Sequence, residues 1–195
     1  EAIRAWASAV RAGTNGAFQL NTWIPDPEPA RDAEHEAGVA GFLGAWGPPV
    51  AAGAGDVRPV DFAAQCEAML EAGPAVISSI MGVYPEHFVR RMKDKGIRWL
   101  AHATAVAGAH AAVAAGADAV IAQGMEAGGH RGTFEAGRAE ASLVGLFALL
   151  PAVVDAVGDR VPVIATGGIA DERGIAAALI LGASAVQIGT GLLRT

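Results

Sequence analysis

A short motif occurs three times along the chain, and it limits the possible folds more than any other feature. In each copy a helical segment ends in Gly, a proline or a short polar step follows, and Ala-Val opens an apolar run; the copies are Ala72–Ile77, Ala115–Ile121 and Leu181–Val186. Such a glycine supplies the left-handed residue that ends many helices. The run after it is typical of a strand buried on both faces. Helices that alternate with such strands predict an α/β fold with a parallel sheet and right-handed crossovers.

The rest of the sequence extends this pattern to six strands with helices between them. The predicted strands are Ala17–Leu20, Ala75–Ile77, Ile97–Ala101, Ala119–Gln123, Val161–Ala165 and a run that begins at Ala185. The predicted helices are Ala2–Ala12, Phe62–Glu71, Glu86–Lys95, Ala105–Ala115, Ser142–Val157 and Glu172–Leu181. Asp61 is expected to cap the helix that begins at Phe62, and Pro85 stands where a first-turn proline belongs.

Two connections are longer than a βα unit requires. The strands that start near residues 75, 97, 119 and 161 are separated by steps of about 22, 22 and 42 residues, so the excess follows Gln123. The segment Trp23–Pro59 holds six of the ten prolines, and prolines break both helices and strand ladders. We expect this segment to be a long loop or lid with room for a short helix.

Six strands fit either a complete doubly wound sheet or part of a (β/α)₈ TIM barrel. Such a barrel normally takes about 250 residues, whereas this chain has 195. We favour the barrel, present as a fragment that lacks the first two strands and the last helix. An open sheet with helices on both faces and intact ends would contradict this interpretation.

The charge balance excludes several classes of partner. The net charge is −6, with 14 basic against 20 acidic residues and no basic run, so we expect binding neither to nucleic acid nor to anionic membranes. No clean apolar stretch reaches the roughly 18 residues of a membrane span. The single cysteine, Cys66, favours a reducing, cytoplasmic location. No histidine pair has the spacing of a zinc site, so no metal is expected.

The glycine-rich segment after Gln123 is the main candidate for chemistry. Gly124–Gly132 contains four glycines, a histidine, a carboxylate and an arginine, and it follows a buried strand. Loops at strand ends are where α/β proteins bind ligands. His130 is the catalytic candidate because an imidazole can take up or hold a proton under working conditions; a solvated loop histidine is the alternative. His102, at the end of another strand, could reach the same rim, whereas the other histidines are expected to be solvated.

Two later glycine turns predict a phosphate site. Thr166–Asp171 and Gln187–Gly191 end the last two strands, and in barrels the corresponding loops commonly bind phosphate. Gly167, Gly168 and Gly189 let backbone N–H groups approach an anion closely. Tight strand-to-helix turns without a ligand are the alternative. The sequence contains neither the Rossmann nor the P-loop signature.

Two amides and two indoles complete the set of candidates. Asn21 and Gln123 stand at strand ends, where a side-chain amide can both donate to and accept from a heterocycle; capping of a loop is the alternative. Trp23 and Trp46 could cover a flat ligand or fill the core. Glu126 and Arg131 could pair with each other or face solvent.

Three segments together resemble a known family. Ala122–Phe134 (AQGMEAGGHRGTF), Val161–Gly174 (VPVIATGGIADERG) and Ala185–Thr195 (AVQIGTGLLRT) are similar to the nitronate monooxygenases, FMN-dependent (β/α)₈-barrel flavoproteins formerly called 2-nitropropane dioxygenases. The resemblance continues from Phe18 onward. It implies that residues 1–195 form a single, partial FMN-binding barrel domain. The family's opening strand, its glycine-rich second strand and the segment after Thr195 have no counterpart here.

The resemblance also implies roles for individual positions. His130 matches the catalytic histidine of the family. The positions that match its FMN contacts are Asn21, Gln123, Gly128, Gly168, Gln187, Ile188, Gly189 and Thr190, with Gly167 adjacent. The implied reaction is the oxidative denitrification of alkyl nitronates or nitroalkanes by O₂. Nothing in the residues indicates the oligomeric state.

Two alternatives remain open at this point. One is an FMN-dependent reductase of the same barrel superfamily, which would use a nicotinamide donor on an enoyl-acyl-carrier protein or a quinone. The other is a barrel that binds a phosphorylated metabolite without flavin.

Overall fold

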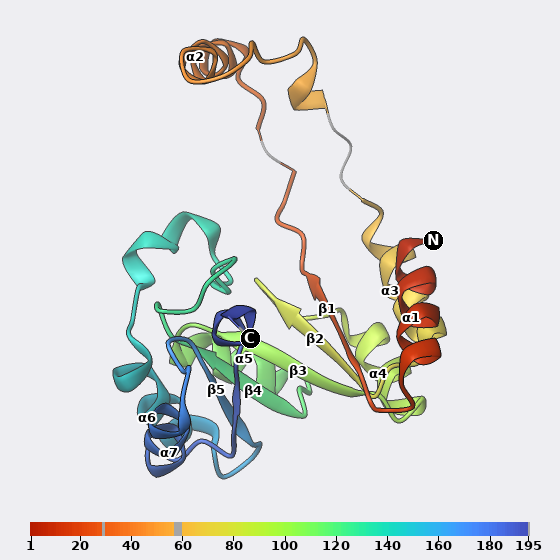
Figure 1. Cartoon of the computed structure of the whole chain (residues 1–195), viewed down its shortest axis with the longest axis vertical. Coiled ribbons are helices and arrows are strands. Elements are labelled where there is room, and N and C mark those ends of the chain that lie inside the picture. Colours follow the sequence, from red (N-terminus) through yellow and green to blue (C-terminus); the bar gives the residue numbers. More distant parts are fainter. Residues whose placement is uncertain (29, 57–59, 195) are drawn as a thin grey trace.

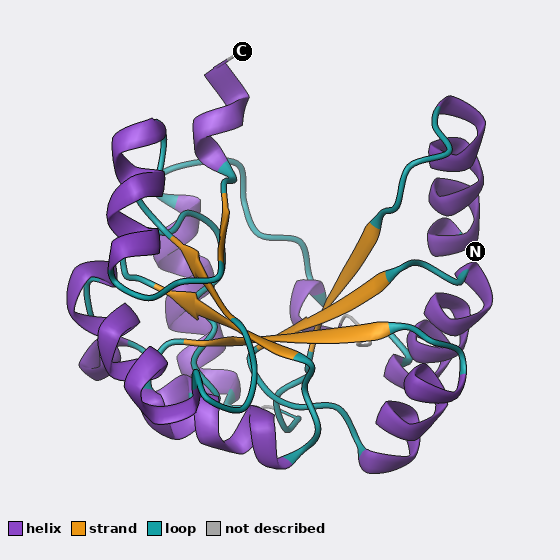
Figure 2. Cartoon of the chain, turned by 90° about the horizontal axis from the view of Figure 1, so that it is seen from below, coloured by secondary structure: helices purple, strands orange, loops and turns teal. Residues whose placement is uncertain are grey.

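The computed structural model describes residues 1–28, 30–56 and 60–194. Pro29, Pro59 and Thr195, which belong to segments named above, lie outside the described residues. The structure is a curved parallel sheet with helices along its outer side (Figures 1 and 2). The strands are β1 (Gln19–Trp23), β2 (Val76–Ile80), β3 (Arg98–Ala103), β4 (Ala119–Gln123), β5 (Val163–Thr166) and β6 (Ala185–Gln187).

The strand order decides between the two architectures. Each strand pairs in parallel with the next one along the chain, in the order β1-β2-β3-β4-β5-β6. A doubly wound sheet instead reverses its strand order at a switch point, whereas a barrel adds its strands in sequence. The prediction of a barrel-type α/β fold with six strands is therefore confirmed, and β1 and β6 form the two edges of the sheet.

The helices cover the outer face of this sheet, apart from one that projects away from it. They are α1 (Ala2–Gly13), α2 (Ala33–Gly44), α3 (Phe62–Ala72), α4 (Glu86–Asp94), α5 (Val106–Ala114), α6 (Leu146–Val157) and α7 (Glu172–Ile180). The hydrophobic core lies between the sheet and this helical layer, where Trp99, Phe88 and Leu150 are fully buried. None of the helices in the described part of the chain has the length and apolar character that a membrane crossing needs.

The motif that predicted the fold has the expected local geometry. Gly73, Gly116 and Gly182 all have positive φ angles, of 56°, 94° and 98°, which L-amino acids with a side chain rarely adopt. The Asp61 carboxylate accepts a hydrogen bond of 3.0 Å from the Ala64 backbone N–H, as a helix cap does. In each of the three copies of the motif, a glycine therefore ends the helical segment and the chain returns to the sheet.

Some boundaries differ from the prediction for reasons that the structure makes clear. Strand β1 runs through Trp23 rather than ending at Leu20, and it pairs with β2 over its whole length. Helix α6 begins at Leu146 rather than Ser142. Both carboxylate oxygens of Glu126 lie 3.0 Å from the Leu146 backbone N–H, so a side chain twenty residues earlier determines where this helix starts.

The proline-rich segment after β1 contains more helix than expected. The short helix allowed for there is α2, which is 12 residues long and is capped by Asp32. No residue of α2 is buried, and the helix projects away from the sheet (Figure 1). The segment is therefore an arm that leaves the barrel after Trp23 and returns to it before α3.

Candidate functional site

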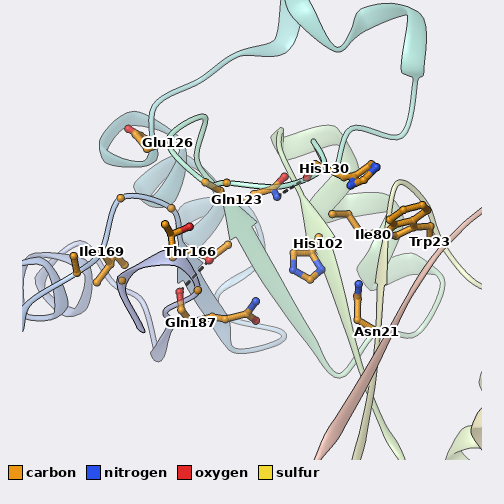
Figure 3. Close-up of a pocket in the computed structure, with 18 residues that line it drawn as sticks. Asn21, Trp23, Ile80, His102, Gln123, Glu126, His130, Thr166, Ile169 and Gln187 are labelled. Atoms are coloured by element: carbon orange, nitrogen blue, oxygen red, sulfur yellow. Dashed lines mark hydrogen bonds between the residues drawn. The ribbon is translucent and has the colours of Figure 1, made fainter. Parts of the chain in front are cut away.

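A pocket lies at the carboxyl end of the sheet, and every strand contributes to it (Figure 3). Its volume is about 640 Å³, within the range of cofactor and ligand sites. The six strands supply, in order, Asn21, Ile80, His102, Gln123, Thr166 and Gln187. Of the residues expected to form the site, all but Ile188 line this pocket. Ile188 instead packs against the hydrophobic core.

Gln123 fastens the glycine-rich loop that carries His130. Its amide nitrogen donates a 3.0 Å hydrogen bond to the backbone oxygen of His130, and its amide oxygen accepts a 2.7 Å bond from the backbone N–H of Gly132. One side chain at the end of β4 thus holds the backbone on both sides of Arg131. The position of His130 follows from this clamp.

Arg131 and Glu126 bind backbone groups instead of pairing with each other. The Arg131 guanidinium donates to the carbonyl oxygen of Gly124 at 2.8 Å and to that of Ser142 at 3.3 Å. Partial burial lowers the pKa of Arg131, an effect that the nearby Glu126 carboxylate opposes. These contacts join the His130 loop to the segment that leads into α6. Arg131 therefore stabilises the loop from a position that does not line the pocket.

Trp23 forms one wall of the pocket and contacts His130. The indole and imidazole centroids are 4.1 Å apart, and the ring planes are inclined by 38°. The Trp23 side chain is 54% exposed and stands at the end of β1 beside His130 (Figure 3). Of the two roles considered for Trp23, the structure therefore supports a pocket wall rather than core filling. Trp46, which is also exposed, does not line the pocket.

His102 lies deeper in the same pocket than His130. It is only 6% exposed, and its Nδ1 is 2.9 Å from the backbone oxygen of Ser79. Burial lowers the pKa of His102, and the hydrogen bond to Ser79 opposes this only in part. His102 is therefore a neutral imidazole held against β2, whereas His130 is exposed at the rim.

A chain of polar side chains orients Asn21. Gln19 Nε2 donates to Ser78 Oγ at 2.8 Å, and Ser78 Oγ donates to Asn21 Oδ1 at 2.8 Å. The oxygen of the Asn21 amide is thus engaged, and the amide group lies at the pocket (Figure 3). This arrangement was not predicted from the sequence. The signal that could have revealed it is Ser78 in the otherwise apolar strand β2, because a buried hydroxyl group needs partners.

The two glycine turns form the other side of the pocket. Gly167 and Gly168 have φ angles of 116° and 68°, and in the described part of the chain their backbone N–H groups donate to no protein acceptor. A Cβ on Gly128 would lie 3.0 Å from Thr190 Oγ1, so the His130 loop approaches the turn after β6 closely. Free N–H groups on a close backbone are suited to binding an anion.

The two glycine turns and the His130 loop thus lie together at the carboxyl end of the sheet. Comparison with known proteins shows to which family a chain with this fold belongs. The model of the nitronate monooxygenase family matches residues 2–195. The chain belongs to the nitronate monooxygenase family. The members of this oxidoreductase family that it resembles include a probable nitronate monooxygenase of Staphylococcus aureus, which is 34% identical over 193 residues, or 95% of this chain and 52% of the relative.

Solved structures agree with this family assignment. The chain is similar to nitroalkane oxidase from Streptomyces ansochromogenes, with 33% identity and a TM-score of 0.81 over 97% of this chain and 54% of that one. FabK from Thermotoga maritima is more distant, with 30% identity and a TM-score of 0.67 over 99% of this chain and 47% of the other. The chain thus spans about half the length of the relatives that it matches.

Proposed function

We propose that the pocket binds FMN and that the protein catalyses the oxidative denitrification of alkyl nitronates with O₂. The observation that carries the proposal is that His130 and two glycine turns line one pocket of about 640 Å³, and that Gly167 and Gly168 in the first turn have backbone N–H groups with no acceptor among the described residues. The pocket thus combines an anion site with a titratable side chain. The names of the relatives and of the nitroalkane oxidase support this substrate class.

The residues present fit a phosphate-bearing cofactor. The turns at Gly167–Gly168 and at Gly189–Thr190 would hold the phosphate, since the glycines leave the backbone accessible and the Thr190 hydroxyl can donate a further bond. The Asn21 amide stands across the pocket, on the side expected to hold the flavin ring, whereas Gly128 lies close to the Thr190 hydroxyl. FMN, when bound, would supply the electron transfer between nitronate and O₂.

The part of the reaction that falls to the protein side chains is proton handling and positioning. His130 stands at the rim, where a substrate has access, and its imidazole can take a proton from the α-carbon of a neutral nitroalkane or donate a hydrogen bond to a nitronate anion. Gln123 would act on the reaction through the loop that it clamps, because both atoms of its amide already bind the backbone. Ile188 would contribute through its backbone alone.

An absorbance spectrum of the purified full-length protein, followed by oxygen uptake with a nitronate, tests this proposal. We expect a flavin spectrum and nitronate-dependent consumption of O₂. Rapid anaerobic bleaching by NADPH would favour the reductase alternative. A protein that stays colourless with added FMN would favour a barrel for a phosphorylated metabolite without flavin.

The single, buried Cys66, whose thiol pKa is raised to about 11 by burial, agrees with the cytoplasmic location that we propose.

A further inference from the structure

The orientation of His102 follows from its contact with β2. A backbone carbonyl oxygen can only accept a hydrogen bond, so the His102 nitrogen that lies 2.9 Å from the Ser79 oxygen must carry the proton. In a neutral imidazole with a proton on Nδ1, the other nitrogen, Nε2, is an acceptor. His102 therefore presents a hydrogen-bond acceptor from the end of β3.

Ser79, the residue that holds His102, is itself fixed. Its hydroxyl donates to the backbone oxygen of Gly82 and accepts from the indole N–H of the buried Trp99, both at 3.0 Å. Ser79 also pairs with Ala101, the neighbour of His102, across the sheet. The imidazole is thus anchored to a rigid part of the core, unlike the exposed ring of His130.

The amide oxygens near His102 in the pocket are already engaged, whereas His102 Nε2 has no hydrogen-bond partner among the described residues. The amide oxygen of Gln123 already accepts from Gly132, and that of Asn21 already accepts from Ser78. No hydrogen bond joins His102 Nε2 to any other described residue, although His102 lines the pocket. Among the described residues the buried polar side-chain atom left without a partner is Arg131 Nε, so His102 Nε2 is open to the pocket. An acceptor that faces a pocket and has no protein partner is suited to a ligand that brings a donor.

The chemistry of the proposed ligands decides which of them brings that donor. A nitronate offers only acceptor oxygens, and a neutral nitroalkane has no N–H or O–H group. FMN brings donors of two kinds, the hydroxyls of its ribityl chain and one ring N–H, at N3 of the oxidised isoalloxazine. The ring is the part expected on the side of the pocket that Asn21 lines, as His102 also does. We propose that His102 is a flavin-binding residue whose Nε2 accepts a hydrogen bond from this N–H. This inference rests on the proposed function, because it requires that the pocket bind FMN.

The test is a flavin titration of the full-length apoprotein and of two variants that separate the two nitrogens of His102. His102→Asn places an amide near the position of Nδ1 and can keep the bond to Ser79, but it has nothing at Nε2. His102→Gln places an amide near Nε2. His110→Asn is the matched control, since His110 is exposed and does not line the pocket. Dissociation constants are measured by quenching of flavin fluorescence, for FMN and for 3-methyl-FMN, which lacks the ring N–H.

We expect His102→Asn to bind FMN about tenfold more weakly than the wild type, which is the scale of one lost hydrogen bond. His102→Gln should keep most of the affinity, and His110→Asn should keep all of it. The wild type should prefer FMN over 3-methyl-FMN, and His102→Asn should lose most of this preference. Circular dichroism confirms that each variant is folded. If His102→Asn is not, the preference of the wild type for FMN over 3-methyl-FMN carries the test, and equal binding of the two flavins by the wild type would overturn the inference.

Two further results would overturn the inference, and they are distinguishable. In the first result, the wild type binds FMN, and His102→Asn either binds both flavins with the same constants as the wild type or keeps the same preference between them. His102 then does not contact the ring N–H, and the proposed function still stands. If the wild type binds no FMN, both proposals fail together.

Discussion

The indole ring of Trp23 lies against the imidazole ring of His130, with 4.1 Å between their centroids. Trp23 ends the first strand of the sheet, whereas His130 belongs to the loop after the fourth. The contact therefore joins an edge strand to a loop in the middle of the fold. It limits the directions that an otherwise exposed histidine can take.

Replacement of Trp23 by alanine should impair catalysis without unfolding the protein. The aromatic contact contributes about 0.5–1.5 kcal/mol, and its loss frees the His130 ring. We expect nitronate turnover to fall on the order of tenfold, because small displacements of catalytic groups are costly. Trp23→Phe should retain most of the activity. Trp46→Ala, a change of the same size at an exposed tryptophan outside the pocket, should leave oxygen uptake unchanged, and equal losses in both alanine variants would contradict this role.

The role of His130 can be decided with two forms of one substrate. His130→Asn removes a base but keeps a hydrogen-bonding side chain. If His130 takes the α-proton, turnover of a neutral nitroalkane should fall by about 10²–10⁴-fold, while turnover of the preformed nitronate falls much less. Steady-state oxygen uptake on both forms gives the comparison. Equal losses on the two would exclude the base role and leave anion binding.

Gln123→Leu should loosen the loop that carries His130. The change leaves the backbone N–H of Gly132 and the backbone oxygen of His130 without their partners. A buried group left unpaired costs about 1–3 kcal/mol, which urea unfolding can measure. Gln123→Glu keeps an acceptor for Gly132 but sets a carboxylate against the carbonyl oxygen of His130 at a buried position, so it should also lose stability. Hydrogen exchange at Gly132 should accelerate in the leucine variant, and unchanged exchange would show that the clamp is not needed.

Alanine substitutions at two glycines with positive φ can separate the cost of backbone strain from the cost of steric crowding by the added Cβ. Gly96 and Gly182 have φ angles of 69° and 98°, so alanine is strained at both, by about 1–2 kcal/mol. A Cβ at Gly96 would meet no atom within 4 Å, whereas one at Gly182 would lie 2.8 Å from Val154 Cγ1. We expect Gly182→Ala to lose about 1–3 kcal/mol more stability than Gly96→Ala. Equal losses in denaturant unfolding would show that the helix layer adjusts freely.

The buried His102 should make the protein more stable at neutral than at mildly acidic pH. Burial lowers its pKa below the ordinary histidine value of 6.5, so between the two values the unfolded chain binds more protons than the folded one. Stability is then fully present above pH 6.5 and decreases as the pH falls towards the folded pKa. Melting temperatures between pH 5 and 8 should decrease less steeply with acid in His102→Asn than in the wild type or in His110→Asn. Parallel curves for all three would rule out this contribution.

Much of the architecture could be predicted because the information is local. The glycine that ends each helix and the apolar run that follows it, as at Gly116 and Val120, lie within a few residues of each other. Gln123 was placed at the rim correctly because β4 ends there, whereas Asn21 was expected just after a strand and lies within β1. The order of the strands followed from the preference for a barrel over a doubly wound sheet, not from a local pattern.

The features that escaped prediction depend on contacts between distant residues. The start of α6 is determined by Glu126, whose carboxylate returns to Leu146, and no local pattern marks that site. The length of α2 was underestimated because the helix buries no face and so lacks the apolar periodicity that identifies most helices. The clamp of Gln123 on His130 and the anchor of His102 on Ser79 likewise appear only in the folded chain.

Glu126 lines the pocket, and its carboxylate accepts a hydrogen bond from the backbone N–H of Leu146, the first residue of α6. A ligand that restrains this side chain therefore also restrains the beginning of a helix on the outside of the barrel. Slower amide exchange at Leu146 would report that the pocket is filled, at a site that the ligand does not touch. The first residue of α6, on the outer side of the sheet, therefore responds to whether the pocket on the other side of this hydrogen bond is filled.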